Sequence, residues 1–73
     1  MRIGVPTEIK THEYRVGMTP SGVRELTRAG HTVLVQSGAG LGAGIGDADF
    51  AAAGAKLERD VEALFAAADL IVK

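Results

Sequence analysis

The stretch TPSGVRELTRAGHTVLVQ, residues 19–36, decides the fold. It opens with threonine and proline, which favour the N-cap and the first turn of a helix, and Gly30 suits the left-handed residue that follows a helix. Val23 and Leu26 recur at the helical period. Residues 31–36, HTVLVQ, are rich in β-branched side chains and predict a strand. A helix followed directly by an apolar strand is the repeating unit of α/β proteins.

Further apolar runs predict strands towards the two ends of the chain. Residues 2–5, RIGV, are stopped by Pro6, and residues 69–73, DLIVK, carry three large apolar side chains in a row. Residues 55–58, AKLE, are compatible with either a one-turn connector or a short strand. Apolar runs, rather than alternation, are typical of strands that are covered on both faces.

Two short helices are expected between these strands. Asp47 is predicted to be the N-cap of the first, which ends at Gly54, and Asp60 the N-cap of the second. The second helix has four apolar residues at the spacing of one helical face: Val61, Leu64, Phe65 and Ala68. This spacing predicts a buried face.

Strands that are separated by helices pair in parallel through right-handed crossovers. We therefore predict an α/β fold, the first half of a flavodoxin-like (Rossmann-like) doubly wound parallel sheet with strand order 2-1-3. Residues 31–36 and 69–73 would then form the two edges. The second edge would be bare and apolar, in a chain small enough to bury only about 60% of its unfolded surface. We therefore expect a symmetric homodimer with Leu70, Ile71 and Val72 in the interface.

Composition argues against several kinds of function. A formal net charge of −1 gives no electrostatic reason to bind nucleic acid. No apolar run is long enough to span a membrane, and the amino-terminal residues lack the pattern of a signal peptide. The histidines, His12 and His31, are isolated, so no metal site is expected. The lack of cysteine fits a reducing, cytoplasmic setting.

A glycine-rich loop, SGAGLGAGIG at residues 37–46, raises the question of a phosphate site. Three of its residues satisfy the G-x-G-x-x-A spacing of a dinucleotide-binding turn: Gly38, Gly40 and Ala43. Helix-forming residues, however, start only after Gly46, whereas the third small residue of that fingerprint lies inside the helix. The last strand also ends at Lys73, where NAD recognition uses an acidic residue. We predict no nucleotide site in this loop and interpret it as one that lets the backbone pack closely.

The loop at residues 7–18 leaves the carboxyl end of the first strand, where doubly wound sheets bind ligands. Arg15 is flanked by a tyrosine and a valine, so the aliphatic part of its side chain can be buried while its guanidinium donates two hydrogen bonds to a carboxylate. The alternative is a surface arginine paired with Glu8 or Glu13, and spacing alone favours this alternative. His12 is interpreted as a solvated loop histidine.

Three motifs resemble the amino terminus of the alanine dehydrogenases, a family that shares this segment with the α subunit of the nicotinamide nucleotide transhydrogenases. The motifs are GVPxE, which ends at Glu8, ExRV, which contains Arg15, and TPxGVxELxxxGHxVxV at residues 19–35. The resemblance covers the whole chain. Within the family, EYRV and the polar loop favour the dehydrogenase.

The resemblance implies a two-domain enzyme that interconverts L-alanine with pyruvate and ammonium, using NAD. Residues 1–73 would be the first half of its substrate-binding domain, with the NAD-binding domain absent. Arg15 matches the family's substrate-carboxylate arginine, and Glu8 or Glu13 is expected beside it.

The same resemblance implies that much of the active site is missing. Lys73 matches the first lysine of a K-x-K-E-P motif whose second lysine contacts substrate, and the catalytic histidine and aspartate lie beyond the chain; His12 does not match the histidine. We therefore expect this chain to be inactive and to bind no cofactor alone. The alternatives are a structural or designed half-domain that self-associates and the amino terminus of a transhydrogenase α subunit.

Overall fold

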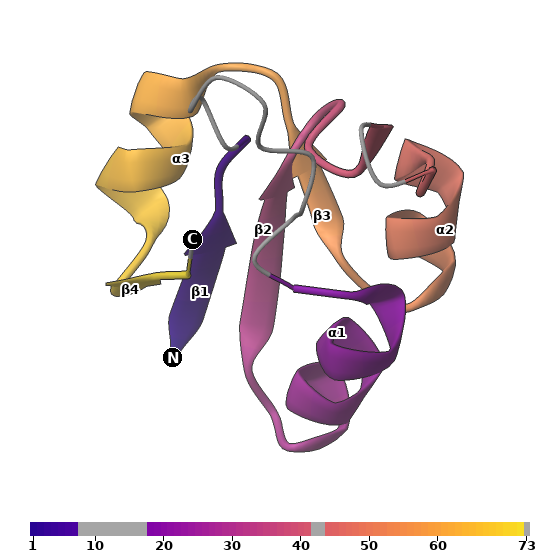
Figure 1. Ribbon diagram of the computed structural model, residues 1–73. Helices are drawn as coiled ribbons and strands as arrows, with labels where there is room; N and C mark the ends of the chain where they lie inside the picture. The colour runs from indigo at the N-terminus through magenta and orange to yellow at the C-terminus, as the bar shows by residue number, and fades with distance from the viewer. Residues whose placement is uncertain (8–17, 42–43, 73) are drawn as a thin grey trace.

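The computed structural model describes residues 1–7, 18–41 and 44–72. Within them, strands and helices alternate along the chain (Figure 1). The elements are β1 (Arg2–Val5), α1 (Pro20–Arg28), β2 (Thr32–Gln36), α2 (Asp47–Ala52), β3 (Lys56–Glu58), α3 (Val61–Ala67) and β4 (Leu70–Ile71).

The strands form one sheet in the order β3-β2-β1-β4, and every pair is parallel. In the register, Ile3 lies between Val33 of β2 and Leu70 of β4. The predicted α/β doubly wound sheet is therefore confirmed, with β1 between β2 and the last strand. The prediction that residues 31–36 form an edge is wrong, because Lys56–Glu58 pairs with the outer side of β2 and extends the order 2-1-3 to 3-2-1-4.

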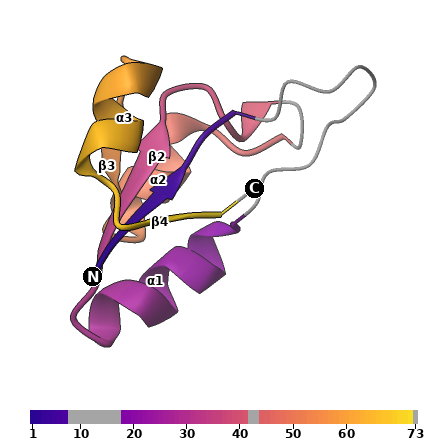
Figure 2. The same ribbon diagram turned by 90° about the vertical axis from the view of Figure 1, so that its left-hand side faces the viewer.

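Helices cover both faces of the sheet (Figures 1 and 2). The chain steps in one direction from β1 to β2 to β3, so right-handed crossovers put α1 and α2 on the same face. It then returns across the sheet to β4, and α3 lies on the opposite face. The direction of winding thus reverses between β1 and β4.

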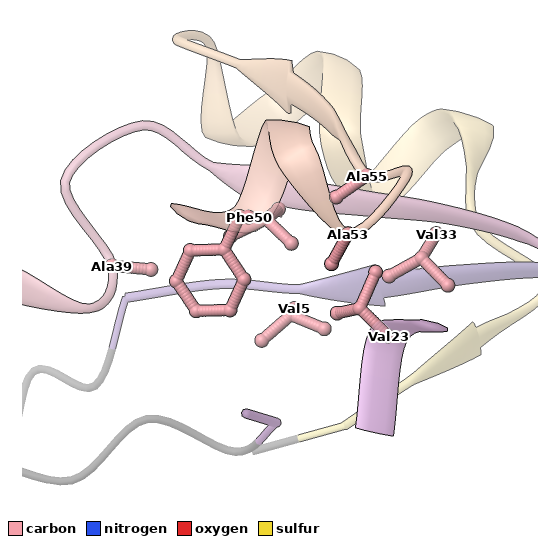
Figure 3. Packing of buried hydrophobic residues seen from close by; sticks show 8 residues of the cluster. Val5, Val23, Val33, Ala39, Phe50, Ala53 and Ala55 are labelled. Carbon is pink, nitrogen blue, oxygen red and sulfur yellow. The ribbon is translucent and has the colours of Figure 1, made fainter. Parts of the chain in front are cut away.

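The main hydrophobic core lies between the sheet and the α1/α2 layer (Figure 3). Its buried members are Val5, Val23, Val33, Val35, Ala39, Phe50, Ala53 and Ala55. Five partly buried side chains pack against it: Met18, Leu26, Ile45, Leu57 and Val72. The core therefore extends to both edges of the sheet, because Leu57 belongs to β3 and Val72 follows β4 directly.

The opposite face is thinner and depends on a close approach. Leu64 of α3 is fully buried, and a Cβ on Gly4 would lie 2.8 Å from the Ala68 Cβ and 3.0 Å from the Leu64 Cδ2. Gly4 therefore lets α3 lie directly on β1. The predicted burial of Val61 and Phe65 is wrong, since they are 37% and 44% exposed. α3 contacts β1, β2 and β3, and these contacts bury Leu64 but leave Val61 and Phe65 exposed.

Several predicted helix ends are confirmed. The Thr19 hydroxyl accepts a hydrogen bond from the Gly22 N–H at 3.2 Å, and Gly30 has a φ of +94°. Asp60 accepts from the Glu62 N–H at 3.0 Å. The prediction that Asp47 is an N-cap is wrong: Gly46 is the N-cap of α2, and Asp47 is the first helical residue.

The described residues contain neither a membrane-spanning helix nor a cluster of metal-binding side chains. No helix there is long and apolar enough to cross a membrane. No three His, Cys, Asp or Glu side chains come together there as a metal site would require.

Candidate functional site

The reversal of winding between β1 and β4 marks the place where a doubly wound sheet binds its ligand. Such crevices lie outside the carboxyl ends of the two strands that flank the reversal. Here those ends are Val5, followed by the buried Pro6, and Ile71, followed by Val72. Any ligand site of this fold type is expected there.

The predicted site residues leave from these strand ends. Residues 8–17 follow β1 and carry Glu8, His12, Glu13 and Arg15, and Lys73 follows β4. All of them lie outside the described residues, so the placement of Arg15 beside Glu8 or Glu13 stays a prediction.

Both ends of the segment that carries Arg15 are anchored. The Thr7 N–H donates a hydrogen bond to the Gln36 Oε1 at 2.8 Å, which joins the exit of β1 to the last residue of β2. At the other end, Met18 packs against the hydrophobic core. Sequence reasoning missed Gln36; the available signal was a polar side chain at the end of the apolar strand TVLVQ.

The glycine loop is closed by Asp47. Its Oδ2 accepts a hydrogen bond from the Ser37 hydroxyl at 2.5 Å, and its Oδ1 accepts from the Gly38 N–H at 2.8 Å. Both hydrogen bonds favour the carboxylate and so lower the pKa of Asp47 below its ordinary value of 3.8. The bond from the Ser37 hydroxyl has the larger effect and the bond from the Gly38 amide the smaller one. Asp47 thus joins the start of the loop to the first turn of α2.

Most of the other amides described in this loop also donate to groups of the protein. The N–H of Ser37 donates to the Glu58 carbonyl, and that of Ile45 donates to the Gly40 carbonyl at 2.8 Å. The Gly46 N–H donates to the Asp49 Oδ2 at 3.0 Å. Further loop amides donate to carbonyls within the loop or at its entrance: those of Ala39, Leu41 and Gly44.

A phosphate-binding loop instead presents free amides to an anion. Here the Gly38 and Gly46 amides already bind carboxylates, and these negative charges would repel a pyrophosphate. The residues described in this loop therefore do not fit a dinucleotide, which supports the prediction that it binds none.

The interpretation of the loop as a close-packing device is confirmed at Gly40. A Cβ there would lie 2.7 Å from both the Ile45 carbonyl oxygen and the Phe50 Cε2. The missing side chain lets the loop backbone rest on the core.

We expect Asp47→Ala to lower the urea midpoint at neutral pH, because it leaves the Ser37 hydroxyl and the Gly38 amide without their acceptor. The depressed pKa sets the sign of the pH dependence. The stabilisation is complete above the unfolded-state pKa near 3.8 and is lost as pH falls through the lower folded-state value. The measurement is urea unfolding of both chains from neutral to acidic pH. A difference in midpoint that does not shrink below pH 3.8 would contradict this role.

The sheet order 3-2-1-4, with helices on both faces and a winding reversal beside β1, places the chain among the doubly wound α/β domains. More specifically, the chain belongs to the family described as "Alanine dehydrogenase/PNT, N-terminal domain", whose model matches residues 4–73. The predicted family is therefore confirmed.

Individual relatives agree with this assignment. The chain is 63% identical to the alanine dehydrogenase of Halomonas elongata and 58% identical to that of Mycobacterium tuberculosis H37Rv, in each case over all 73 residues. It spans 20% of the length of each.

Solved structures show the same likeness. An L-alanine dehydrogenase, 46% identical, superposes with a TM-score of 0.95, and a transhydrogenase from Sinorhizobium meliloti, 33% identical, with a TM-score of 0.89. Each match covers 100% of this chain and 20% of the other.

Proposed function

We propose that this chain is the first part of the substrate-binding domain of an NAD-dependent alanine dehydrogenase. The reaction would be L-alanine + NAD⁺ + water to pyruvate + ammonium + NADH + H⁺. The observation that carries the proposal is the 63% identity to an alanine dehydrogenase over the full 73 residues. A cytoplasmic location belongs to the same proposal and is supported by the lack of cysteine.

In this proposal the Arg15 guanidinium binds the carboxylate of alanine or pyruvate, with Glu8 and Glu13 as supporting residues. The ExRV motif supports this role. So does the origin of the segment, which leaves β1 beside the winding reversal and starts at Thr7, tethered to Gln36. A planar guanidinium suits a planar carboxylate because it donates two parallel hydrogen bonds.

The chain alone would be inactive in this account. The glycine loop does not fit a dinucleotide, so the remaining four-fifths of the enzyme would bind NAD. That remainder would also supply the catalytic histidine and aspartate that the family resemblance implies. Alanine dehydrogenation needs a hydride acceptor facing the α carbon and a proton acceptor close to the amino nitrogen. The contribution of this chain would be to bind and orient the substrate.

A chimera tests the proposal. This chain would replace the matching 73 residues of the H. elongata alanine dehydrogenase, 63% identical to it. We expect the purified chimera to reduce NAD in the presence of L-alanine, followed as NADH absorbance, and the isolated chain to give no turnover above background. A folded chimera without alanine-dependent NADH formation would contradict the proposed function, and turnover by the isolated chain would contradict its inactivity.

The likeness to the transhydrogenase supports a second candidate, the amino terminus of a transhydrogenase α subunit. The higher identity to the alanine dehydrogenase structure, 46% against 33%, favours the dehydrogenase. A chimera that folds but fails with alanine, while the same graft into the S. meliloti protein retains transhydrogenation, would reverse this order.

A further inference from the structure

At its carboxyl end, the ladder between β1 and β2 is continued by a side chain instead of the backbone. The Thr32 N–H donates a hydrogen bond to the Met1 carbonyl at 3.0 Å. Alternate residues of a strand direct their N–H groups to the same side, so the Thr7 N–H also faces β2. In the observed register, the backbone acceptor that would continue the ladder is the Gln36 carbonyl.

Other groups take both hydrogen bonds of this next rung. The Thr7 N–H donates to the Gln36 Oε1 at 2.8 Å, while the Gln36 carbonyl accepts from the Ala39 N–H at 2.9 Å. The Gly38 N–H, which would have continued the ladder from β2, donates to the Asp47 Oδ1 at 2.8 Å. The chain thus turns away from β1 after Gln36, and the Gln36 side chain bridges the gap back to Thr7.

Gln36 is well suited to hold the exit of β1. It ends a strand that pairs with β1 on one side and β3 on the other, and it follows the fully buried Val35. A group that is carried by a rigid strand holds its partner more precisely than one on a loop. Its amide oxygen also accepts the bond without a charge, so Gln36 places no negative charge where an anionic carboxylate is to bind.

We propose that Gln36 is a positioning residue of the substrate site. By holding the Thr7 N–H, it fixes the direction in which the chain leaves β1 beside the winding reversal. The inference rests on the proposed function, in which Arg15, further along the same segment, binds the substrate carboxylate. Gln36 itself touches no substrate and acts through the segment that it holds. A displacement of a substrate-binding group by about 1 Å can cost on the order of a hundredfold in rate.

Gln36→Met in the chimera tests this role, because methionine is nearly as long as glutamine but lacks the amide oxygen. The KM for pyruvate should rise by about tenfold, with the KM for NADH unchanged. Ser37→Ala is the matched control, since it removes a side-chain hydrogen bond at the same end of β2 but none that Thr7 uses. It should leave the KM for pyruvate unchanged. Equal rises in the two variants, or no rise in Gln36→Met, would overturn the proposal.

A double variant shows whether Gln36 acts through Arg15. In the Arg15→Met background, Gln36→Met should change kcat/KM for pyruvate by less than about twofold, because the group that it positions is already absent. A further loss as large as that in the unsubstituted chimera would overturn the proposal. The unsubstituted chimera keeps the two claims apart: its inactivity would contradict the proposed function itself, whereas these variants test Gln36 in an active enzyme.

Amide hydrogen exchange of the 73-residue chain tests the contact without any activity. The Thr7 amide should exchange about tenfold faster or more in Gln36→Met, which removes its acceptor, and stay protected in Gln36→Glu, which keeps an oxygen at the same reach. The Gly38 amide, bonded to Asp47, is the internal reference and should not change. A Thr7 amide that is equally protected in Gln36→Met would overturn the proposal.

Discussion

Valine in place of Gly40 is expected to destabilise the chain by about 3 kcal/mol or more, enough to unfold much of it. A Cβ there would lie 2.7 Å from the Ile45 carbonyl oxygen and from the fully buried ring of Phe50. Neither neighbour can move away easily. The Ile45 N–H donates to the Gly40 carbonyl at 2.8 Å, and Phe50 is packed among the core residues.

Urea unfolding followed by circular dichroism measures this effect, with Gly46→Val as the matched control. Gly46 lies in the same loop, but the nearest atom to its added Cβ is the Asp49 Oδ2 at 3.7 Å. Valine there should cost about 1 kcal/mol, because valine is a poorer N-cap than glycine. Equal losses at the two positions would show that the loop does not rest on the core as described.

Arg15→Met in the chimera is expected to lower kcat/KM for pyruvate by about a hundredfold, because it removes one partner of a charged, doubly hydrogen-bonded pair. Arg15→Lys should be milder, with about a tenfold rise in the KM for pyruvate, since a point charge replaces the planar fork. Initial rates of reductive amination supply both values.

The KM for NADH is the control for the Arg15 variants. It should stay close to that of the unsubstituted chimera, because NAD is held elsewhere in the proposed enzyme. An unchanged KM for pyruvate in Arg15→Lys would remove Arg15 from the substrate site.

Local signals made the helix ends predictable. Thr19, Gly30 and Asp60 act within one turn of their own helix, so their roles follow from neighbouring residues alone. Asp47 had the same local signal, but its carboxylate binds Ser37 and Gly38, ten and nine residues earlier, and Gly46 takes the cap position instead. A contact made by the folded loop therefore overrode the local preference.

Strand β3 and the face of α3 depend on packing partners that sequence periodicity does not describe. Three residues, KLE, carry no usable pattern, and they form a strand because β2 offers them an open side. Val61 and Phe65 do have helical spacing, but the contacts of α3 with the sheet, including the close approach at Gly4, bury Leu64 and leave these two side chains exposed. Both features are set by the sheet rather than by the segment itself.

The position of the candidate site and the identity of its arginine were predictable from different features of the sequence. The order of strands and helices placed it at the carboxyl ends of the strands, whereas the choice of Arg15 came from the resemblance, since spacing alone favoured a surface arginine. The tether from Thr7 to Gln36 joins residues 29 positions apart, and no local pattern announces such a bond.

The coupling between Arg15 and the substrate carboxylate tests the central claim most directly. In the chimera, kcat/KM would be measured for pyruvate and for methyl pyruvate, whose carboxylate is esterified, with and without Arg15→Met. The account predicts that the substitution costs pyruvate about a hundredfold and methyl pyruvate little, because the ester has no charge to lose a partner. An equal loss for both substrates would contradict the claim that this chain supplies the carboxylate-binding arginine of an alanine dehydrogenase.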